Sequence, residues 1–366
     1  MSSNRREFLK GMGAAAGAMA ACARGTAALS AENAAPGMAQ QGGAAAGKNR
    51  ADWMYRAKWG VFMHYLASSP SLPSAEWNRL IDGFDVEGLA GQIQSVGAGY
   101  LFITLGQNSG HYLSPNRTYD SFVGIRPSKC SRRDLVADLY AALARRHVSL
   151  MVYLPAGAPD GDPVAMKALE WKNGPHRNAA FQLKWQQVIA EWSERWGDKV
   201  RGWWFDGCYW PKAMYRSCSP PNFRTFAEAA RKGNPGSAVA FNPGVFYPIF
   251  AESAQEDYTA GEIDDPTRVH CYGRWVDGAQ FHMLSYLGSR WSYGEPRFPV
   301  AQVAEISAAL VRRGGVVTWD VPHGPTGRLS DSFMRQLNAI GEAVGRAGSK
   351  WRRVSALRDS AVSEGC

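Results

Sequence analysis

Polar side chains that can carry acid–base chemistry follow several short apolar runs of this chain. Asp206 ends the run GWWF within VRGWWFDGCYW at residues 200–210, Glu262 follows DYTAG, and Asp320 follows VVTW. Other polar side chains end similar runs: His64, Gln107, Asn108, Tyr153 and Asn242. Carboxylates, amides and aromatic rings together suit a neutral, hydroxyl-rich ligand, because hydroxyls need donors and acceptors and C–H faces pack on aromatic rings.

The apolar runs predict the elements that must position these groups. Near-continuous apolar strands separated by amphipathic helices indicate a parallel sheet buried on both faces. Eight such repeats favour a single closed (β/α)8 barrel, in which chemistry lies at the carboxyl ends of the strands. An open doubly wound sheet is the alternative, although no GxGxxG motif follows the first strand. The predicted strands are residues 59–66, 100–105, 150–155, 202–206, 238–242, 258–263, 281–287 and 316–321, with helical patterns in residues 132–147, 181–196 and 300–314.

The amino-terminal region has the order of an export signal. Arg5 and Arg6 precede Phe8 and Leu9, and a small-residue stretch runs over residues 11–21. This predicts a twin-arginine signal and a periplasmic or secreted protein, not a stable membrane span. Lipid anchoring at Cys22 is less favoured than cleavage. We expect a signal over residues 1–31, an Ala/Gly-rich linker over 32–50, the barrel over 51–348 and a tail over 349–366.

Charge and cysteine content argue against two classes of partner. The formal net charge is +9, but residues 1–50 contribute +4, with six Lys and Arg against Glu7 and Glu32. The remaining positive charge is spread without long basic runs, so we expect no nucleic acid partner. The six cysteines include no CxxC pair, so we expect no metal site. Pairing of Cys208 with Cys218 in an oxidising compartment is left open.

Several segments resemble the retaining α-L-fucosidases of bacteria and lysosomes. The segments are MYRAKWGVFMHY, SAEWNRL, RRDLVADLYAALARRHVSLMVYL, WWFDG and RRGGVVTWDVPHGPTGRLSDSFMRQLNAIGEAV. Together the similarity extends over about residues 52–347. It implies an exported glycoside hydrolase with a glycan substrate, a two-step retaining mechanism and no cofactor.

The resemblance assigns roles to particular residues. Asp206 corresponds to the nucleophile and His64 to a sugar-binding histidine, while Glu76 and Trp77 lie in the segment of a cleft loop. Retaining hydrolysis needs a second carboxyl group about 5–5.5 Å from the nucleophile. The other expected substrate-binding residues are Gln107, Asn108, His111, Tyr153, Trp204, Asn242, His282 and Trp291.

The chain departs from the family at three places, one of which is Asp320, where the family's last strand commonly ends in Asn. Gln107 and Asn108 replace two adjacent histidines, and Phe281 and His282 replace a Trp-Glu pair whose glutamate is the acid/base in many members. The acid/base is therefore not carried over by the resemblance. Glu262 is the first candidate, and Asp320 is the second because its apolar setting should raise its pKa. A different neutral or deoxy sugar, or a non-catalytic carbohydrate-binding role, remains as an alternative.

Overall fold

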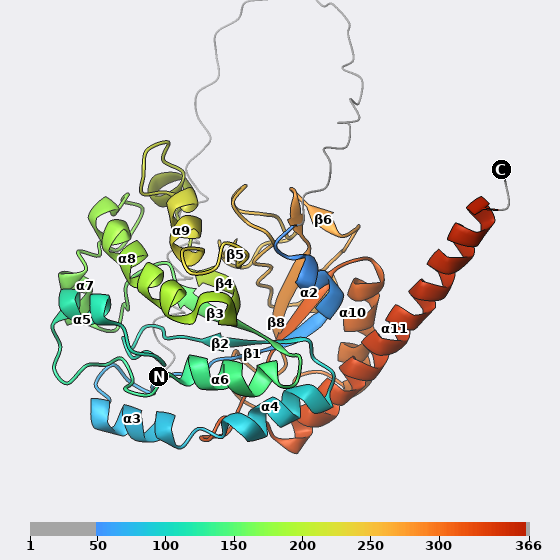
Figure 1. Ribbon diagram of the computed structural model, residues 1–366, viewed down its shortest axis with the longest axis horizontal. Coiled ribbons are helices and arrows are strands. Elements are labelled where there is room, and N and C mark those ends of the chain that lie inside the picture. Colours follow the sequence, from blue (N-terminus) through green and yellow to red (C-terminus); the bar gives the residue numbers. More distant parts are fainter. Residues whose placement is uncertain (1–48, 364–366) are drawn as a thin grey trace, which may run out of the picture. The chain divides into compact units, whose positions relative to one another are not determined.

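A curled parallel sheet of seven strands organises the computed structural model, which describes residues 49–363 and the side chains of residues 49–347 (Figure 1). The strand order is β5-β4-β3-β2-β1-β9-β8, and every neighbouring pair is parallel. The strands are β1 (Trp59–Met63), β2 (Tyr100–Thr104), β3 (Ser149–Pro155), β4 (Val200–Asp206), β5 (Ala238–Phe241), β8 (His282–Tyr286) and β9 (Val316–Asp320). A separate antiparallel hairpin pairs β6 (Trp275–Val276) with β7 (Ala279–Gln280).

The helices connect the strands and cover the sheet. In the described part of the chain, α10 packs on β9 and against α11, and α4 packs on α6 (Figure 1). None of the helices described is long and apolar enough to cross a membrane. The helices are α2 (Asp52–Ala57), α3 (Ser74–Asp82), α4 (Val86–Ser95), α5 (Arg117–Val123), α6 (Leu135–Ala144), α7 (Pro163–Ala168), α8 (Ala179–Trp196), α9 (Phe223–Ala230), α10 (Val300–Arg312) and α11 (Asp331–Ser363), with short turns at Gly197–Lys199, Pro211–Tyr215 and Pro266–Arg268.

Local sequence explains where several helices begin and end. The side chain of Asn116 accepts from the backbone N–H of Tyr119 at the start of α5, and Gly124 ends that helix with φ of +71°. Asp134 accepts from the N–H of Ala137 at the start of α6. Such caps satisfy backbone groups that a helix end leaves without a partner.

The strand order excludes a doubly wound sheet, because β1 lies between β2 and β9 with no reversal of winding. Seven of the eight predicted strands form. The predicted strand at 258–263 is present only as isolated bridges to β7 and β8, because Gly261 has φ of +63°, outside the extended region. Backbone hydrogen bonds still join this segment to both sheet edges: Asp257 N to Val239 O at 2.9 Å, and Ile263 N to Leu284 O at 3.0 Å.

Alternate residues of the strands enter two different cores. Phe62, Tyr153 and Trp204 belong to an inner cluster, whereas Val152 and Trp203 belong to a larger cluster that includes the apolar faces of the helices. This is the two-residue period of a strand buried on both faces. Residues that continue the inner face beyond the last apolar position therefore gather at the carboxyl ends of the strands.

The predicted segment boundaries can be compared with the range that the structure describes. The predicted signal, the linker up to residue 48 and Cys22 lie outside the described residues. Helix α11 runs from Asp331 to Ser363 and so crosses position 348, where we expected the barrel to end.

Candidate active site

Asp206 ends β4 on the inner face, two residues after Trp204, and is partly exposed. Its Oδ1 accepts from the backbone N–H of Gly207 and from Asn242 Nδ2, both at 2.8 Å. Its Oδ2 accepts from the Tyr153 hydroxyl at 2.6 Å. Hydrogen bonds from neutral donors hold both oxygens and fix the direction of the carboxyl group.

Asn242 joins Asp206 to a second carboxyl group. The parallel register pairs Phe205 with Phe241, so Asp206 and Asn242 come next on adjacent chain segments. Asn242 Nδ2 lies 2.8 Å from Asp206 Oδ1 and 2.5 Å from Glu262 Oε2. Together these two distances limit the separation of the two carboxylate oxygens to 5.3 Å at most. A separation of about 5–5.5 Å is characteristic of retaining glycosidases.

A further hydrogen bond extends this network to the loop that follows β2. Gln107 Nε2 donates to the Tyr153 hydroxyl at 2.6 Å, and that hydroxyl donates to Asp206. Burial and the nearby Asp206 carboxylate raise the pKa of Tyr153 well above its usual range, so the phenol keeps its proton. The Tyr153 ring stacks on Trp204 with centroids 5.4 Å apart, and the Trp204 indole donates to Ala260 O at 3.0 Å.

His64 and Asp320 form a second polar group at the ends of β1 and β9. His64 Nδ1 lies 2.7 Å from Asp320 Oδ1, and the backbone N–H of Ser292 donates to Asp320 Oδ2 at 2.5 Å. The Asp320 side chain is fully buried, whereas that of His64 is 12% exposed. This arrangement directs the other nitrogen of His64 away from the aspartate. Trp291 lies beside His64, with ring centroids 6.0 Å apart.

His282 lies deeper, inside the sheet. Its Nδ1 donates to Thr259 O at 2.9 Å, and its Nε2 accepts from the Thr318 hydroxyl at 2.6 Å. Burial lowers the pKa of His282 to about 4, so the ring is neutral at physiological pH. A neutral, fully buried imidazole with both nitrogens bonded is a structural residue of the interior.

The residues of the loops after β1 and β2 occupy different environments. Trp77 is buried, and its indole donates to Tyr112 O at 3.0 Å. Glu76 is exposed on α3, where a hydrogen bond from Arg79 lowers the pKa of its carboxyl group. His111 is buried against Trp77, and burial lowers its pKa. The Asn108 side chain is exposed. Trp77 and His111 thus pack as core residues, and Glu76 forms a helix-surface ion pair.

The structure adds residues that the sequence did not single out. Ser292 has φ of +61°, and its N–H reaches Asp320. Gly244 has φ of +106°, and its N–H donates to Asn242 Oδ1 at 3.2 Å. Tyr209 lies at the same end of β4, near the Tyr153 hydroxyl, where its charge contributes to the raised pKa of Tyr153. Among these residues only Gly244 carried a local signal in the sequence, because it follows Asn242-Pro243 and an Asn-Pro pair favours a turn. Cys208 and Cys218 are both free thiols.

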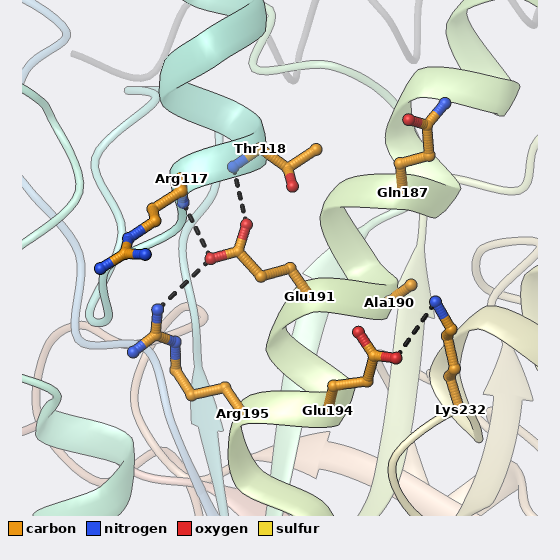
Figure 2. Close-up of a pocket in the computed structure, with 8 residues that line it drawn as sticks. All are labelled: Arg117, Thr118, Gln187, Ala190, Glu191, Glu194, Arg195 and Lys232. Atoms are coloured by element: carbon orange, nitrogen blue, oxygen red, sulfur yellow. Dashed lines mark hydrogen bonds and ion pairs between the residues drawn. The ribbon is translucent and has the colours of Figure 1, made fainter.

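A surface depression of about 520 Å³ lies over the outer helices α5 and α8 (Figure 2). Glu191 of α8 accepts from the backbone N–H groups of Arg117 at 2.9 Å and Thr118 at 2.7 Å. It therefore caps the amino terminus of α5 from a neighbouring helix. Because Glu191 pairs with Arg195 and Glu194 pairs with Lys232, and no lining residue belongs to the strand ends, we assign this depression to helix packing.

Comparison with known proteins gives matches at the level of structure. No family model and no curated protein matches the sequence. The endo-fucoidan hydrolase MfFcnA4 from glycoside hydrolase family 107 matches with a TM-score of 0.63 and 19% identity, over 80% of this chain and 53% of that one. This chain thus spans about half the length of MfFcnA4.

Two shorter enzymes match along most of their length. The endo-fucoidan hydrolase P5AFcnA matches with a TM-score of 0.62 and 17% identity, over 81% of this chain and 93% of that one. The α-L-fucosidase AlfC from Lactobacillus casei, in complex with its α-L-fucose product, matches with a TM-score of 0.58 and 16% identity, over 82% of this chain and 100% of that one. The chain therefore has the α/β fold of these glycoside hydrolases, which confirms the predicted likeness to fucosidases at the level of the fold.

Proposed function

We propose that this protein is a glycoside hydrolase that cleaves fucose-containing glycans with retention of configuration. The observation that carries the proposal is the pair of carboxyl groups, Asp206 and Glu262, on the amide nitrogen of Asn242. The fold shared with an α-L-fucosidase and with endo-fucoidan hydrolases supports fucose as the sugar. Further support comes from an AlfC variant, with an aspartate replaced by alanine, that was solved with 4-nitrophenyl α-L-fucopyranoside.

The proposed mechanism has two steps. In the first, an oxygen of Asp206 bonds to the anomeric carbon as the bond to the leaving oxygen breaks, and Glu262 gives its proton to that oxygen. In the second, Glu262 takes a proton from water, the water oxygen bonds to the anomeric carbon, and Asp206 leaves. Asp320 has no direct part in this scheme, because its side chain is fully buried behind His64 and Ser292, whereas Asp206 is partly exposed. We assign it the orientation of His64, which binds a sugar hydroxyl.

The proposal includes the finer architecture and the destination of the protein. We infer that segment 257–263 takes the eighth position of a (β/α)8 barrel, supported by its hydrogen bonds to both sheet edges. We also propose export through the twin-arginine pathway, supported by Arg5, Arg6 and the small-residue stretch that follows. To test this, both arginines are replaced by lysine and the cells are fractionated. We expect the variant to remain unexported in the cell, because the signal has lost its paired arginines.

The function is tested with protein that lacks residues 1–31, assayed on a panel of aryl glycosides that includes 4-nitrophenyl α-L-fucopyranoside. We expect release of 4-nitrophenol, with α-L-fucose as the first product seen by proton NMR. With azide, Asp206→Ala should give the β-fucosyl azide, because azide enters on the face of the missing nucleophile. Glu262→Ala with azide should give the α-fucosyl azide from the covalent intermediate.

Four results would contradict the assignment or part of it. An initial β-L-fucose product would exclude retention. The same azide anomer from both variants would exclude the proposed roles. Cleavage of glycosides of another deoxy or neutral sugar, with no cleavage of fucosides, would keep the assigned reaction but change the assigned substrate. Glycan binding without cleavage of any glycoside in the panel would instead identify a carbohydrate-binding protein.

A further inference from the structure

Asn242 lies between the two carboxyl groups of the proposed reaction. The two reaction steps do not themselves use a residue at this place. Its side chain is fully buried between the two carboxyl groups, with Nδ2 at 2.8 Å from Asp206 and 2.5 Å from Glu262. A carboxamide nitrogen carries two N–H groups, so it can donate one to each carboxyl group. One residue thus contacts both members of the pair.

The direction of this amide is fixed from its other end. The backbone N–H of Gly244 donates to Asn242 Oδ1 at 3.2 Å, which places the carbonyl oxygen away from the carboxyl groups. The reverse orientation would point the amide oxygen at two acceptors. The backbone of Asn242 is also held, because its N–H donates to Phe205 O at 2.8 Å and its carbonyl accepts from Cys208 N at 2.9 Å.

Two carboxyl groups this close would otherwise interact directly. Carboxylates that share a site compete for one proton, and one of them is then held protonated by the charge of the other. That proton would lie between the two groups, where it serves neither attack nor leaving-group protonation. A separate donor to each group weakens this competition, since each oxygen that faces the partner already accepts a hydrogen bond.

We propose that Asn242 is a positioning residue that keeps Asp206 and Glu262 within reach of one glycosidic bond and directs the proton of Glu262 to Oε1. Glu262 Oε2 accepts from the amide and therefore has the character of the carbonyl oxygen. This inference rests on the proposed function, because it assigns Glu262 as the acid and Asp206 as the nucleophile. It goes beyond that function by naming the group that separates the two roles.

Other titratable groups face this pair and stay in place when Asn242 is changed. The Tyr153 hydroxyl donates to Asp206, and Tyr209 lies near that hydroxyl. Burial raises the pKa of Cys208, and the nearby Asp206 charge raises it further. The remaining groups on neighbouring elements are Glu256 beside β5, which also raises the Cys208 pKa, and the His64–Asp320 pair on β1 and β9.

The test measures kcat/KM against pH for the wild type, Asn242→Leu and Asn242→Asp, each on phenyl and 4-nitrophenyl α-L-fucopyranoside. Leucine keeps the approximate size of asparagine and removes both donors. The alkaline limb of the profile should then move to higher pH by about one unit, because Glu262 loses a hydrogen bond and shares its proton with the Asp206 carboxylate. Aspartate adds a negative charge between the groups, so its alkaline limb should move further.

Leaving-group dependence separates this role from a general loss of structure. A misdirected proton harms a poor leaving group most, so phenyl fucoside should lose about 10²-fold in kcat/KM and 4-nitrophenyl fucoside much less. Asn116→Leu is the matched control, since Asn116 is another buried, hydrogen-bonded asparagine but lies at the start of α5. It should lower the unfolding temperature and leave the pH profile and the leaving-group ratio unchanged.

The inference is overturned if both Asn242 variants fold, as judged by circular dichroism, and keep the wild-type limbs. It is also overturned if the two substrates lose activity equally. Should Asn242→Leu not fold, the isosteric Asn242→Asp decides by the same readouts. These outcomes differ from failure of the proposed function, in which the wild type itself cleaves no fucoside.

Discussion

The two aspartates at this site differ both in their hydrogen-bond partners and in their burial. Asp206 is held by Gly207, Asn242 and Tyr153, whereas Asp320 is held by His64 and Ser292. The two aspartates end strands in similar sequence contexts, yet one is partly exposed and the other is fully buried. Their chemistry therefore differs because their environments differ.

At this scale the role of Asp320 gives a prediction. Asp320→Asn replaces one acceptor oxygen by an NH2 group, so the side chain can no longer accept hydrogen bonds from both His64 and Ser292. Loss of a hydrogen bond to a charged group should lower kcat/KM by roughly 10- to 100-fold through misorientation of His64. Steady-state kinetics on 4-nitrophenyl α-L-fucopyranoside measure this. Asp320→Glu, which retains the carboxylate, should recover part of the loss, and a variant with full activity would refute the orienting role.

At the scale of elements, the sheet is regular where strands pair and irregular at segment 257–263. Gly261 has φ of +63°, and a Cβ there would lie 2.0 Å from the carbonyl oxygen of His282. This close approach of two backbones lets Leu284 N donate to Gly261 O at 2.8 Å. The segment that carries Glu262 is thus docked against β8 only because residue 261 has no side chain.

Gly261→Ala should therefore destabilise the fold. The clash and the strained backbone together should lower the free energy of unfolding by about 2 kcal/mol or more. Urea denaturation followed by tryptophan fluorescence measures this change. Gly91→Ala in α4 is the control, because a Cβ there meets nothing within 4 Å and alanine favours the helix. A Gly261→Ala protein as stable as the control would contradict the docking argument.

At the scale of the whole molecule, burial of polar groups makes stability depend on pH. His282 is fully buried, and burial lowers its pKa from the ordinary 6.5 to about 4. Between these values the unfolded chain binds a proton that the folded chain does not, so stability rises with pH across this window. The contribution is complete above pH 6.5 and is lost as the pH falls through 4.

Replacing this histidine should flatten that dependence. His282→Gln keeps a donor and an acceptor but does not titrate, so about 3 kcal/mol of the pH-dependent change between pH 6.5 and 4 should disappear. Urea unfolding at several pH values on wild type and variant gives the two curves. His147→Gln, at an exposed position between α6 and β3, is the comparison. Parallel curves for wild type and His282→Gln would show that His282 is not the group responsible.

The sequence by itself determined the local elements and the candidates that they carry. The alternation of apolar strands with helices predicted β1–β5, β8 and β9 within one or two residues at most ends, and it placed Asp206, Glu262 and Asp320 at segment ends. These features depend on two-residue and 3.6-residue periods, which are set by neighbours along the chain. The irregular backbone of segment 257–263 could not be predicted in this way, because it depends on the close contact of Gly261 with the backbone of β8.

Only the tertiary structure decided which groups meet. Asn242 lies 36 residues from Asp206 and 20 from Glu262 in sequence, and His64 lies 256 residues from Asp320. Such pairings follow from strand order and register around the curled sheet, which no local pattern encodes. Tertiary packing also decides the different burial of two adjacent residues of α3: Glu76 is exposed, and Trp77 is buried. Adjacent residues of a helix point in different directions, and only the packing of that helix shows which direction is solvent.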